Sequence, residues 1–167
     1  MDSVSAHILI VDPRAANLAI LARRLGAEGY RVTTATDGAA AIVALSRKPA
    51  NLVLAELTME PLSGIELTGA IRAEAIWRDL PVILITGRTE PGGVVRALEG
   101  GADDVVVKPF HFEVLAARIA RQLERARNLG QLRADVAAMD ARVTNRAIEL
   151  GELKYRVAED ERERASA

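Results

Sequence analysis

The sequence predicts a doubly wound α/β domain, in which helices cover both faces of a parallel sheet. Five short runs rich in Val, Ile, Leu and Thr alternate with stretches whose apolar residues recur at helical spacing. Gly, Pro or Asp bounds these runs, as expected for strands that end in loops. Strands that are apolar along nearly their whole length are buried on both faces, which is typical of parallel sheets covered by helices.

Each element can be assigned in chain order. The predicted strands are residues 7–11 (HILIV), 31–36 (RVTTAT), 51–56 (NLVLAE), 81–86 (PVILIT) and 104–108 (DVVVK). Between them, helices with buried stripes are predicted from Leu18, Leu21 and Leu25; Ala41, Ile42 and Leu45; Ile65, Leu67 and Ile71; and Val94, Val95 and Leu98. A last helix follows, with Ile119, Leu123 and Ala126 as its stripe. Gly29 and Gly100 are well placed to end the first and fourth helices.

Composition and charge exclude several classes of site. The 167 residues include no cysteine, which excludes disulfides, thiolate metal ligands and a cysteine nucleophile. The 22 basic and 23 acidic residues give a net charge of −1, from which we expect neither a nucleic-acid partner nor a membrane partner. The sequence has no run of about 18 apolar residues to span a bilayer, and its N-terminus lacks a signal-peptide pattern. We therefore expect a cytoplasmic protein.

Polar residues stand where four of the predicted strands end. These residues are Asp12, Glu56, Thr86 and Lys108, the last followed by Pro109. Sites in doubly wound sheets lie beyond the carboxyl ends of the strands, so the four side chains are expected to converge. Two carboxylates, a hydroxyl and an ammonium suit an anion or phosphoryl group beside a hard cation. Simpler roles stay open: Asp12 as a helix N-cap, Thr86 as a strand former, and Glu56 with Lys108 as a structural ion pair.

Four segments resemble the receiver domains of two-component response regulators. They are ILIVD with Asn17 five residues on, LTMEPLSGIEL, PVILITGR and GGADDVVVKPF, and the resemblance covers residues 7–125. It implies the flavodoxin-like receiver fold, a five-stranded parallel sheet with strand order 2-1-3-4-5. It also implies a phosphorelay in which a histidine kinase passes a phosphoryl group to an aspartate at the end of strand three. A histidine kinase or another signalling protein is thus an expected partner, and no enzymatic activity is expected of the chain itself.

Two residues depart from the family's phosphorylation site. Asp12 matches one of the family's two Mg²⁺-binding acidic residues, while Thr86 and Lys108 match its phosphoryl-contacting pair. Glu56 stands at the phosphoacceptor position, where its carboxylate projects about 1.5 Å further than that of aspartate. Pro13 replaces the second acidic residue and offers no side-chain oxygen for Mg²⁺. The resemblance therefore implies a degenerate receiver, or pseudo-receiver, without a cofactor and with a weakened or absent Mg²⁺ site.

Residues 127–167 differ in character from residues 1–126, and we assign the two ranges to a coiled-coil helix and a receiver-like domain. An apolar seam at alternating spacings of three and four predicts the coiled coil: Leu129, Leu132, Val136, Met139, Val143, Leu150, Leu153 and Val157, interrupted by Arg146. Valine at one seam position and Leu or Met at the other favours a parallel homodimer. Across it Glu149 can reach Lys154, whereas Asp135 faces Asp140. A single solvated helix is the alternative.

Three functions are compatible with these patterns. The first is a pseudo-receiver that dimerises through its coiled coil and acts through partner contacts without phosphoryl transfer. The second is a receiver that accepts phosphate at an unusual site, on Glu56 or Asp12. The third is a structural coiled-coil protein capped by a receiver fold. No output domain is recognisable, so the chain can also be the N-terminal part of a larger regulator.

Overall fold

The computed structural model describes residues 5–87 and 91–166. Contacts divide the chain into two compact units, Met1–Ala126 and Arg127–Ala167, which are described separately below. The boundary falls inside the last helix, α5 (Phe112–Ala165). Among the described residues, no helix is long and apolar enough to cross a membrane.

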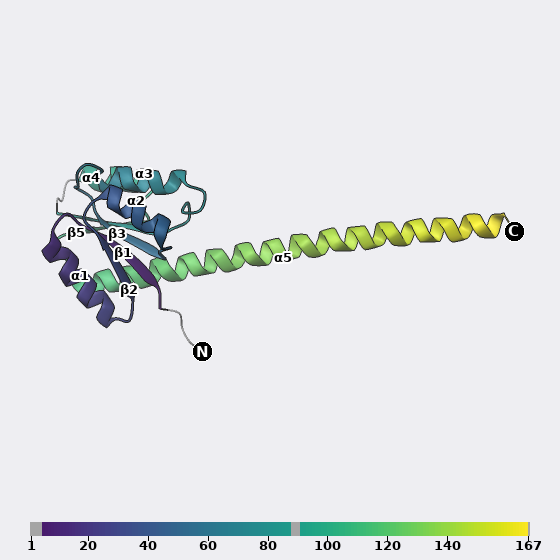
Figure 1. Ribbon diagram of the computed structural model, residues 1–167, viewed down its shortest axis with the longest axis horizontal. Coiled ribbons are helices and arrows are strands. Elements are labelled where there is room, and N and C mark those ends of the chain that lie inside the picture. Colours follow the sequence, from purple (N-terminus) through teal and green to yellow (C-terminus); the bar gives the residue numbers. More distant parts are fainter. Residues whose placement is uncertain (1–4, 88–90, 167) are drawn as a thin grey trace. The chain divides into compact units, whose positions relative to one another are not determined.

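The first unit is built on a five-stranded parallel sheet with the order β2-β1-β3-β4-β5 (Figure 1). Its strands are β1 (His7–Val11), β2 (Arg31–Ala35), β3 (Leu52–Glu56), β4 (Val82–Thr86) and β5 (Asp104–Val107). The predicted fold class and strand order are confirmed. β1 has the predicted bounds, and each other strand is one residue shorter at one end.

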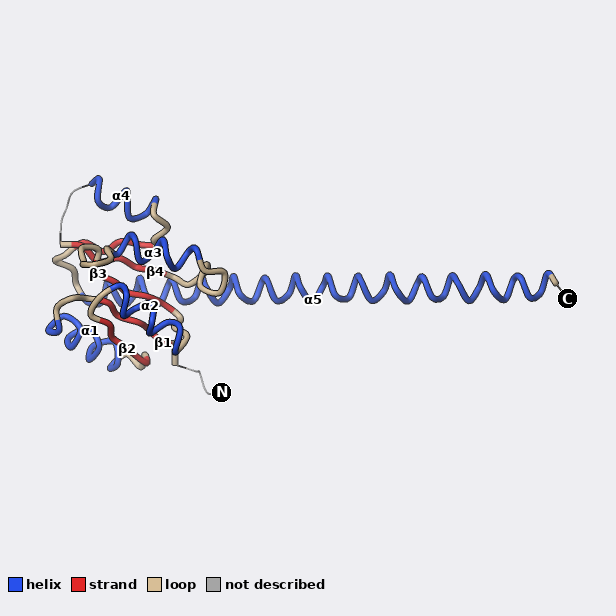
Figure 2. Tube along the Cα trace, turned by 45° about the horizontal axis from the view of Figure 1, so that its top comes forward, coloured by secondary structure: helices blue, strands red, loops and turns tan. Residues whose placement is uncertain are grey.

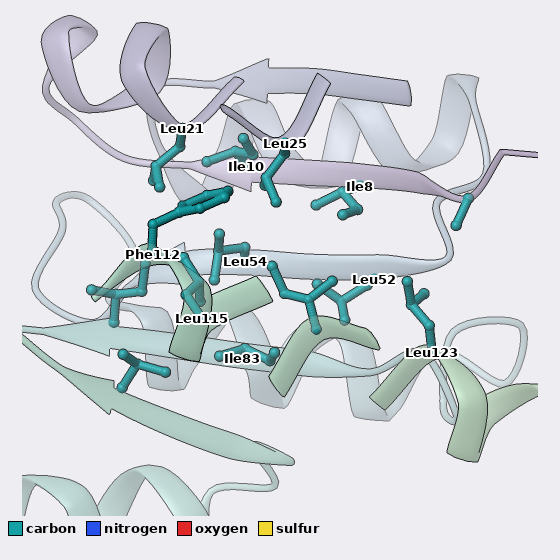
Figure 3. Close-up of a cluster of buried hydrophobic side chains, with 14 of the residues drawn as sticks. Ile8, Ile10, Leu21, Leu25, Leu52, Leu54, Ile83, Phe112, Leu115 and Leu123 are labelled. Carbon is teal, nitrogen blue, oxygen red and sulfur yellow. The ribbon is translucent and has the colours of Figure 1, made fainter. Parts of the chain in front are cut away.

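Helices cover both faces of this sheet (Figure 2). The alternation of side chains along each strand divides the core into two layers. On one face, α1 (Ala15–Ala27) and the start of α5 pack on side chains such as Ile8, Leu54 and Ile83 (Figure 3). On the other face, α2 (Gly38–Arg47), α3 (Gly64–Ala73) and α4 (Pro91–Glu99) pack on the intervening strand residues. Both layers form because almost every residue of β1, β3 and β4 is buried.

The predicted stripe of α4 is wrong in two residues. Val95 and Leu98 are 50% and 47% exposed, whereas Ala97 is fully buried and Val94 is half-buried. The buried stripe is centred one position away around the helix, so the two larger residues face outward. The helix ends as predicted before a glycine pair, but the positive φ, 98°, belongs to Gly101. Gly100 instead leaves room for the Ile65 side chain, which would lie 2.9 Å from an added Cβ.

α3 begins in close contact with the end of β3. A Cβ on Gly64 would lie 2.7 Å from the carbonyl oxygen of Glu56, so only glycine fits there without a shift. Ser63 and Glu66 form a capping box, in which the Ser63 hydroxyl accepts from the Glu66 N–H at 3.2 Å and the Glu66 carboxylate accepts from the Ser63 N–H at 2.8 Å. The start of α3 is thereby fixed beside Glu56.

Arg72, in the last turn of α3, joins the loops at the amino ends of β4 and β5. Its guanidinium donates to the carbonyl oxygens of Leu80 at 2.8 Å and Gly101 at 2.9 Å. It also donates to the Asp103 carboxylate at 2.8 Å, and the same carboxylate oxygen accepts from the Val82 N–H at 2.8 Å. One side chain thus supplies hydrogen bonds to backbone groups that no strand pairs.

The second unit is the C-terminal part of α5 alone. The eight apolar residues of the predicted seam are all exposed in the single chain, from 38% at Leu129 to 68% at Val143. Ile148 and Tyr155 are also exposed on this segment, at 56% and 66%. The helix therefore has a long apolar stripe that no other described part of the chain buries.

Candidate functional site

The four predicted site residues lie at the carboxyl ends of their strands. Glu56 and Thr86 are the last residues of β3 and β4, and Asp12 and Lys108 directly follow β1 and β5. Asp12 and Thr86 are each 4% exposed, and the Thr86 carbonyl oxygen accepts a hydrogen bond from the Lys108 N–H at 2.7 Å. The peptide bond between Lys108 and Pro109 is cis. Arg88, the last residue of the PVILITGR segment, lies outside the described residues.

Glu56 and Lys108 form a direct ion pair. The Lys108 Nζ donates to the Glu56 Oε2 at 2.6 Å, and the Glu56 side chain is only 11% exposed against 33% for Lys108. Such a short, half-buried, charge-assisted bond holds both groups in one geometry. The ammonium that matches the family's phosphoryl contact is therefore already engaged by the side chain at the acceptor position.

Asp12 has a different set of partners. Its Oδ1 accepts from the Arg14 N–H at 2.8 Å and its Oδ2 accepts from the Asn17 side-chain amide at 2.9 Å. The alternative role of Asp12 as the N-cap of α1 is wrong, because the N-cap residue is Arg14, which makes no side-chain capping bond. Asp12 instead fixes the loop between β1 and α1 through the two bonds.

The residues around Asp12 do not fit Mg²⁺. The ion requires near-octahedral coordination by oxygen, and Pro13 supplies no side-chain oxygen. Glu56 accepts a hydrogen bond from the Lys108 ammonium, so one of its carboxylate oxygens is already engaged. Within residues 5–87 and 91–166, no group of three or more His, Cys, Asp or Glu side chains is placed to hold a metal ion.

A pocket that the sequence did not predict lies next to Asp12 and Lys108. It is open to solvent on one side, has a volume of about 150 Å³ and is lined by residues of α1, the end of β4 and the segment that leads into α5. Its walls include Leu21, Ile85 and Phe112, which the sequence indicates only as apolar core residues. The pocket could not be predicted because the apolar periodicity of a helix does not indicate where two packed elements leave a gap.

The chain is similar to known regulatory proteins along the first unit. Residues 8–120 match the family described as response regulator receiver domain. Transcriptional regulatory protein KdpE of Mycobacterium tuberculosis is 34% identical over 134 residues, which cover 80% of this chain and 58% of KdpE. DNA-binding response regulator MtrA of the same species is 34% identical over 125 residues, which cover 75% of this chain and 54% of MtrA.

A solved structure gives the same result for the fold. The receiver domain of a signal transduction histidine kinase from Syntrophus aciditrophicus is 32% identical, with a TM-score of 0.68. The alignment covers 72% of this chain and 91% of that domain.

The expectation that nucleic acid is excluded as a partner is wrong. MtrA is named as DNA-binding and KdpE as a transcriptional regulator, and both share the receiver sequence. This chain spans little more than half the length of these relatives, 58% and 54%, so its net charge says nothing about their remaining parts. Binding to nucleic acid also depends on local basic patches, which a net charge near zero does not exclude.

The match over residues 8–120, the strand order and the four residues at the strand ends lead to one conclusion. The chain belongs to the response regulator receiver domain family of two-component systems.

Proposed function

We propose that this protein is a pseudo-receiver, which signals through partner contacts without accepting a phosphoryl group. The observation that carries the proposal is the 2.6 Å ion pair between Lys108 and Glu56. Phosphoryl transfer would require Glu56 to leave Lys108 and attack, while Lys108 turns to the phosphoryl oxygens. The half-buried ion pair must be broken before the new contacts form, which adds to the barrier for transfer.

The longer side chain and the lost metal ligand work in the same direction. Glutamate places its carboxylate about 1.5 Å beyond that of aspartate, and a misplacement of about 1 Å can lower a rate about a hundredfold. Pro13 removes an oxygen ligand, which weakens the binding of the Mg²⁺ that would offset the charge of an incoming phosphoryl group. Both features support a receiver whose state does not depend on a histidine kinase.

Intact-mass measurement after incubation with acetyl phosphate and Mg²⁺ tests this proposal. The wild-type chain is expected to gain no phosphoryl group. The matched variant Pro13→Asp/Glu56→Asp restores both carboxylates of the family pattern and is expected to gain one, with release of acetate. A phosphoryl group on the wild type that is lost in Glu56→Ala or Asp12→Ala would instead establish an unusual acceptor, the alternative function.

We propose further that the second unit acts as a dimerisation helix. The eight exposed apolar seam residues, together with Arg146, recur at alternating spacings of three and four, the pattern of a two-stranded coiled coil. A second copy is the occupant that this pattern fits, because an identical helix offers the same apolar seam. The flanking charges do not decide the alignment, since Glu149 would meet Lys154 but Asp135 would meet Asp140 in the parallel dimer. Light scattering at tens of micromolar is expected to give twice the mass of the chain, and a monomer would contradict the proposal.

A role in transcription is a second candidate, which the relatives favour. KdpE and MtrA are regulators whose length this chain covers to 58% and 54%. Fluorescence anisotropy with a random-sequence duplex, at low and at physiological salt, tests whether the 167-residue chain itself contributes to DNA binding. Saturable binding would support that contribution. If no binding is seen, any contact with DNA must come from a protein segment outside these 167 residues or from a partner.

A further inference from the structure

We propose that the pocket beside Asp12 binds a small organic cation, a primary ammonium that carries an apolar group of about ring size. The pocket, about 150 Å³ in volume, brings together charged and apolar side chains from α1, β4 and the start of α5. Some charged groups of the pocket already have a partner of opposite charge. The charge of the ligand is inferred from the group that has none.

Both cations that line the pocket are engaged. Lys108 donates to Glu56 at 2.6 Å. The Arg24 guanidinium lies 4.3 Å above the centre of the Phe112 ring and 3.9 Å from the Glu113 carboxylate. Arg24 thus already has an aromatic ring and a carboxylate as neighbours, and Lys108 has Glu56, so Asp12 is the group from which the charge of the ligand is argued.

Asp12 is the charged group without an opposite charge. Within the described part of the chain, no Lys, Arg or His nitrogen lies within 4.0 Å of its carboxylate, which is held by the Arg14 N–H and the Asn17 amide. At 4% exposure, water cannot replace a cation fully. Each carboxylate oxygen has a second lone pair, so an ammonium can add a hydrogen bond without displacing the existing donors.

The apolar walls define the rest of the ligand. Leu21 and Phe112 are each 8% exposed and Ile85 is 3% exposed, so they present carbon surface within the pocket. Ile20, also on the lining, is 50% exposed and marks the mouth. Apolar cavities of about 150 Å³ admit benzene, so a single ring is a fitting body for the cation. A hydrated Mg²⁺ would gain nothing from these walls.

Benzylammonium is the probe for this site, added to the ¹⁵N-labelled 167-residue chain and followed by amide chemical shifts. Saturable shifts are expected around Asn17, Leu21 and Phe112, with a Kd on the order of 1 mM, as for other small fragments. Benzyl alcohol, with the same shape and no charge, is expected to bind about tenfold more weakly, since a hydrogen bond to a charged group is the stronger.

Variants assign the effect to Asp12. Asp12→Asn should weaken benzylammonium at least about fivefold, while leaving benzyl alcohol unchanged. Glu99→Gln removes one negative charge from an exposed position on α4 and should have no effect. Ile20→Trp narrows the mouth and should weaken both probes, which keeps the test decisive if Asp12→Asn does not fold.

Three results would overturn the proposal: tighter binding of benzoate than of benzylammonium, equal affinity in Asp12→Asn, or displacement of the probe by millimolar Mg²⁺. The test does not depend on dimerisation or on phosphoryl transfer, so either proposal can fail without the other.

Discussion

The two units of the chain treat their apolar residues in opposite ways. In the first unit, Leu54 is fully buried in the core, whereas in the second unit Val143 is 68% exposed. Both residues follow regular sequence patterns, one typical of a buried strand and one of a coiled coil. An apolar pattern thus predicts that a side chain will be buried. Whether its own chain or a second chain buries it depends on the elements that surround it.

This difference predicts different responses to concentration. A core closed within one chain has a free energy of unfolding that does not depend on protein concentration. A stripe that is covered only by a second chain gains stability as concentration rises. Variants in the two units should therefore separate association from folding.

The largest effect is expected from a charge in the seam. Val143→Asp places a carboxylate between two helices and should weaken the dimer at least about a hundredfold, because it would be buried without a cationic partner. Sedimentation should show a monomer, while the circular dichroism of the first unit stays unchanged. Ala141→Asp adds the same charge outside the seam and should remain dimeric; loss of the dimer there as well would mean that charge alone, not position, drives the effect.

A cavity in the core should have the converse effect. Leu54→Ala should lower the free energy of unfolding of the first unit by about 3 kcal/mol, since it removes fully buried methyl groups. Its dimer mass should not change. The matched change in the seam, Leu150→Ala, should weaken the dimer and leave the denaturant midpoint of the first unit as it is. Equal effects of both variants on that midpoint would contradict the independence of the two units.

The hydrogen bonds of Arg72 should contribute about 2 kcal/mol to the free energy of unfolding of the first unit. Arg72→Ala removes the donor to the carbonyl oxygens of Arg78, Leu80 and Gly101. The Asp103 carboxylate keeps the Val82 N–H but loses its cation, and unmade bonds of buried groups cost about 1 to 3 kcal/mol. Urea denaturation should show a lower midpoint with an unchanged slope. Arg72→Lys restores the charge but not the fork of donors, and should recover only part of the loss.

Arg146 should lower the free energy of unfolding of the coiled coil by about 1 kcal/mol relative to an apolar residue at the same position. As a seam residue, it must direct its charged end outward along an apolar stem. Arg146→Leu fills the seam and should raise the melting temperature of the helical segment at fixed concentration. An equal rise in Arg142→Leu, which lies outside the seam, would point to helix propensity as the cause.

The smallest effect concerns pH and the capping box of α3. Hydrogen bonds from the Ser63 backbone and side chain lower the pKa of Glu66, so the ionised form is favoured in the folded state. The resulting stabilisation is fully present above the ordinary glutamate pKa of about 4.3 and is lost as pH falls through the lower, folded value. The difference in unfolding free energy between wild type and Glu66→Gln should be constant near neutral pH and shrink in acid. A difference that persists in acid would exclude ionisation as its source.

Much of the fold could be predicted because strand periodicity and burial coincide. All five strands were located within one residue, and the ion pair between Glu56 and Lys108 was among the alternatives. The features that were missed depend on packing between distant elements. Arg72 is one of many arginines in the sequence, and nothing local marks it as the donor to Leu80 and Gly101.

His7 illustrates the same limit. It opens β1 and is 2% exposed, and its two ring nitrogens form hydrogen bonds with the Pro49 carbonyl oxygen at 2.7 Å and the Thr33 hydroxyl at 2.8 Å. A polar residue at the start of a strand is ordinarily taken as exposed. Burial became possible here because β2 and the loop before β3 supply both partners.

Gly64 has a mechanical consequence for the acceptor position. The missing methyl group brings the backbone of α3 within van der Waals contact of the Glu56 carbonyl, and the Gly64 N–H donates to the Leu57 carbonyl at 2.8 Å. No compressible side chain lies between the two segments at this point. We therefore expect a displacement of α3 to move the main chain of Glu56 through this contact, and a movement of Glu56 to shift the start of α3.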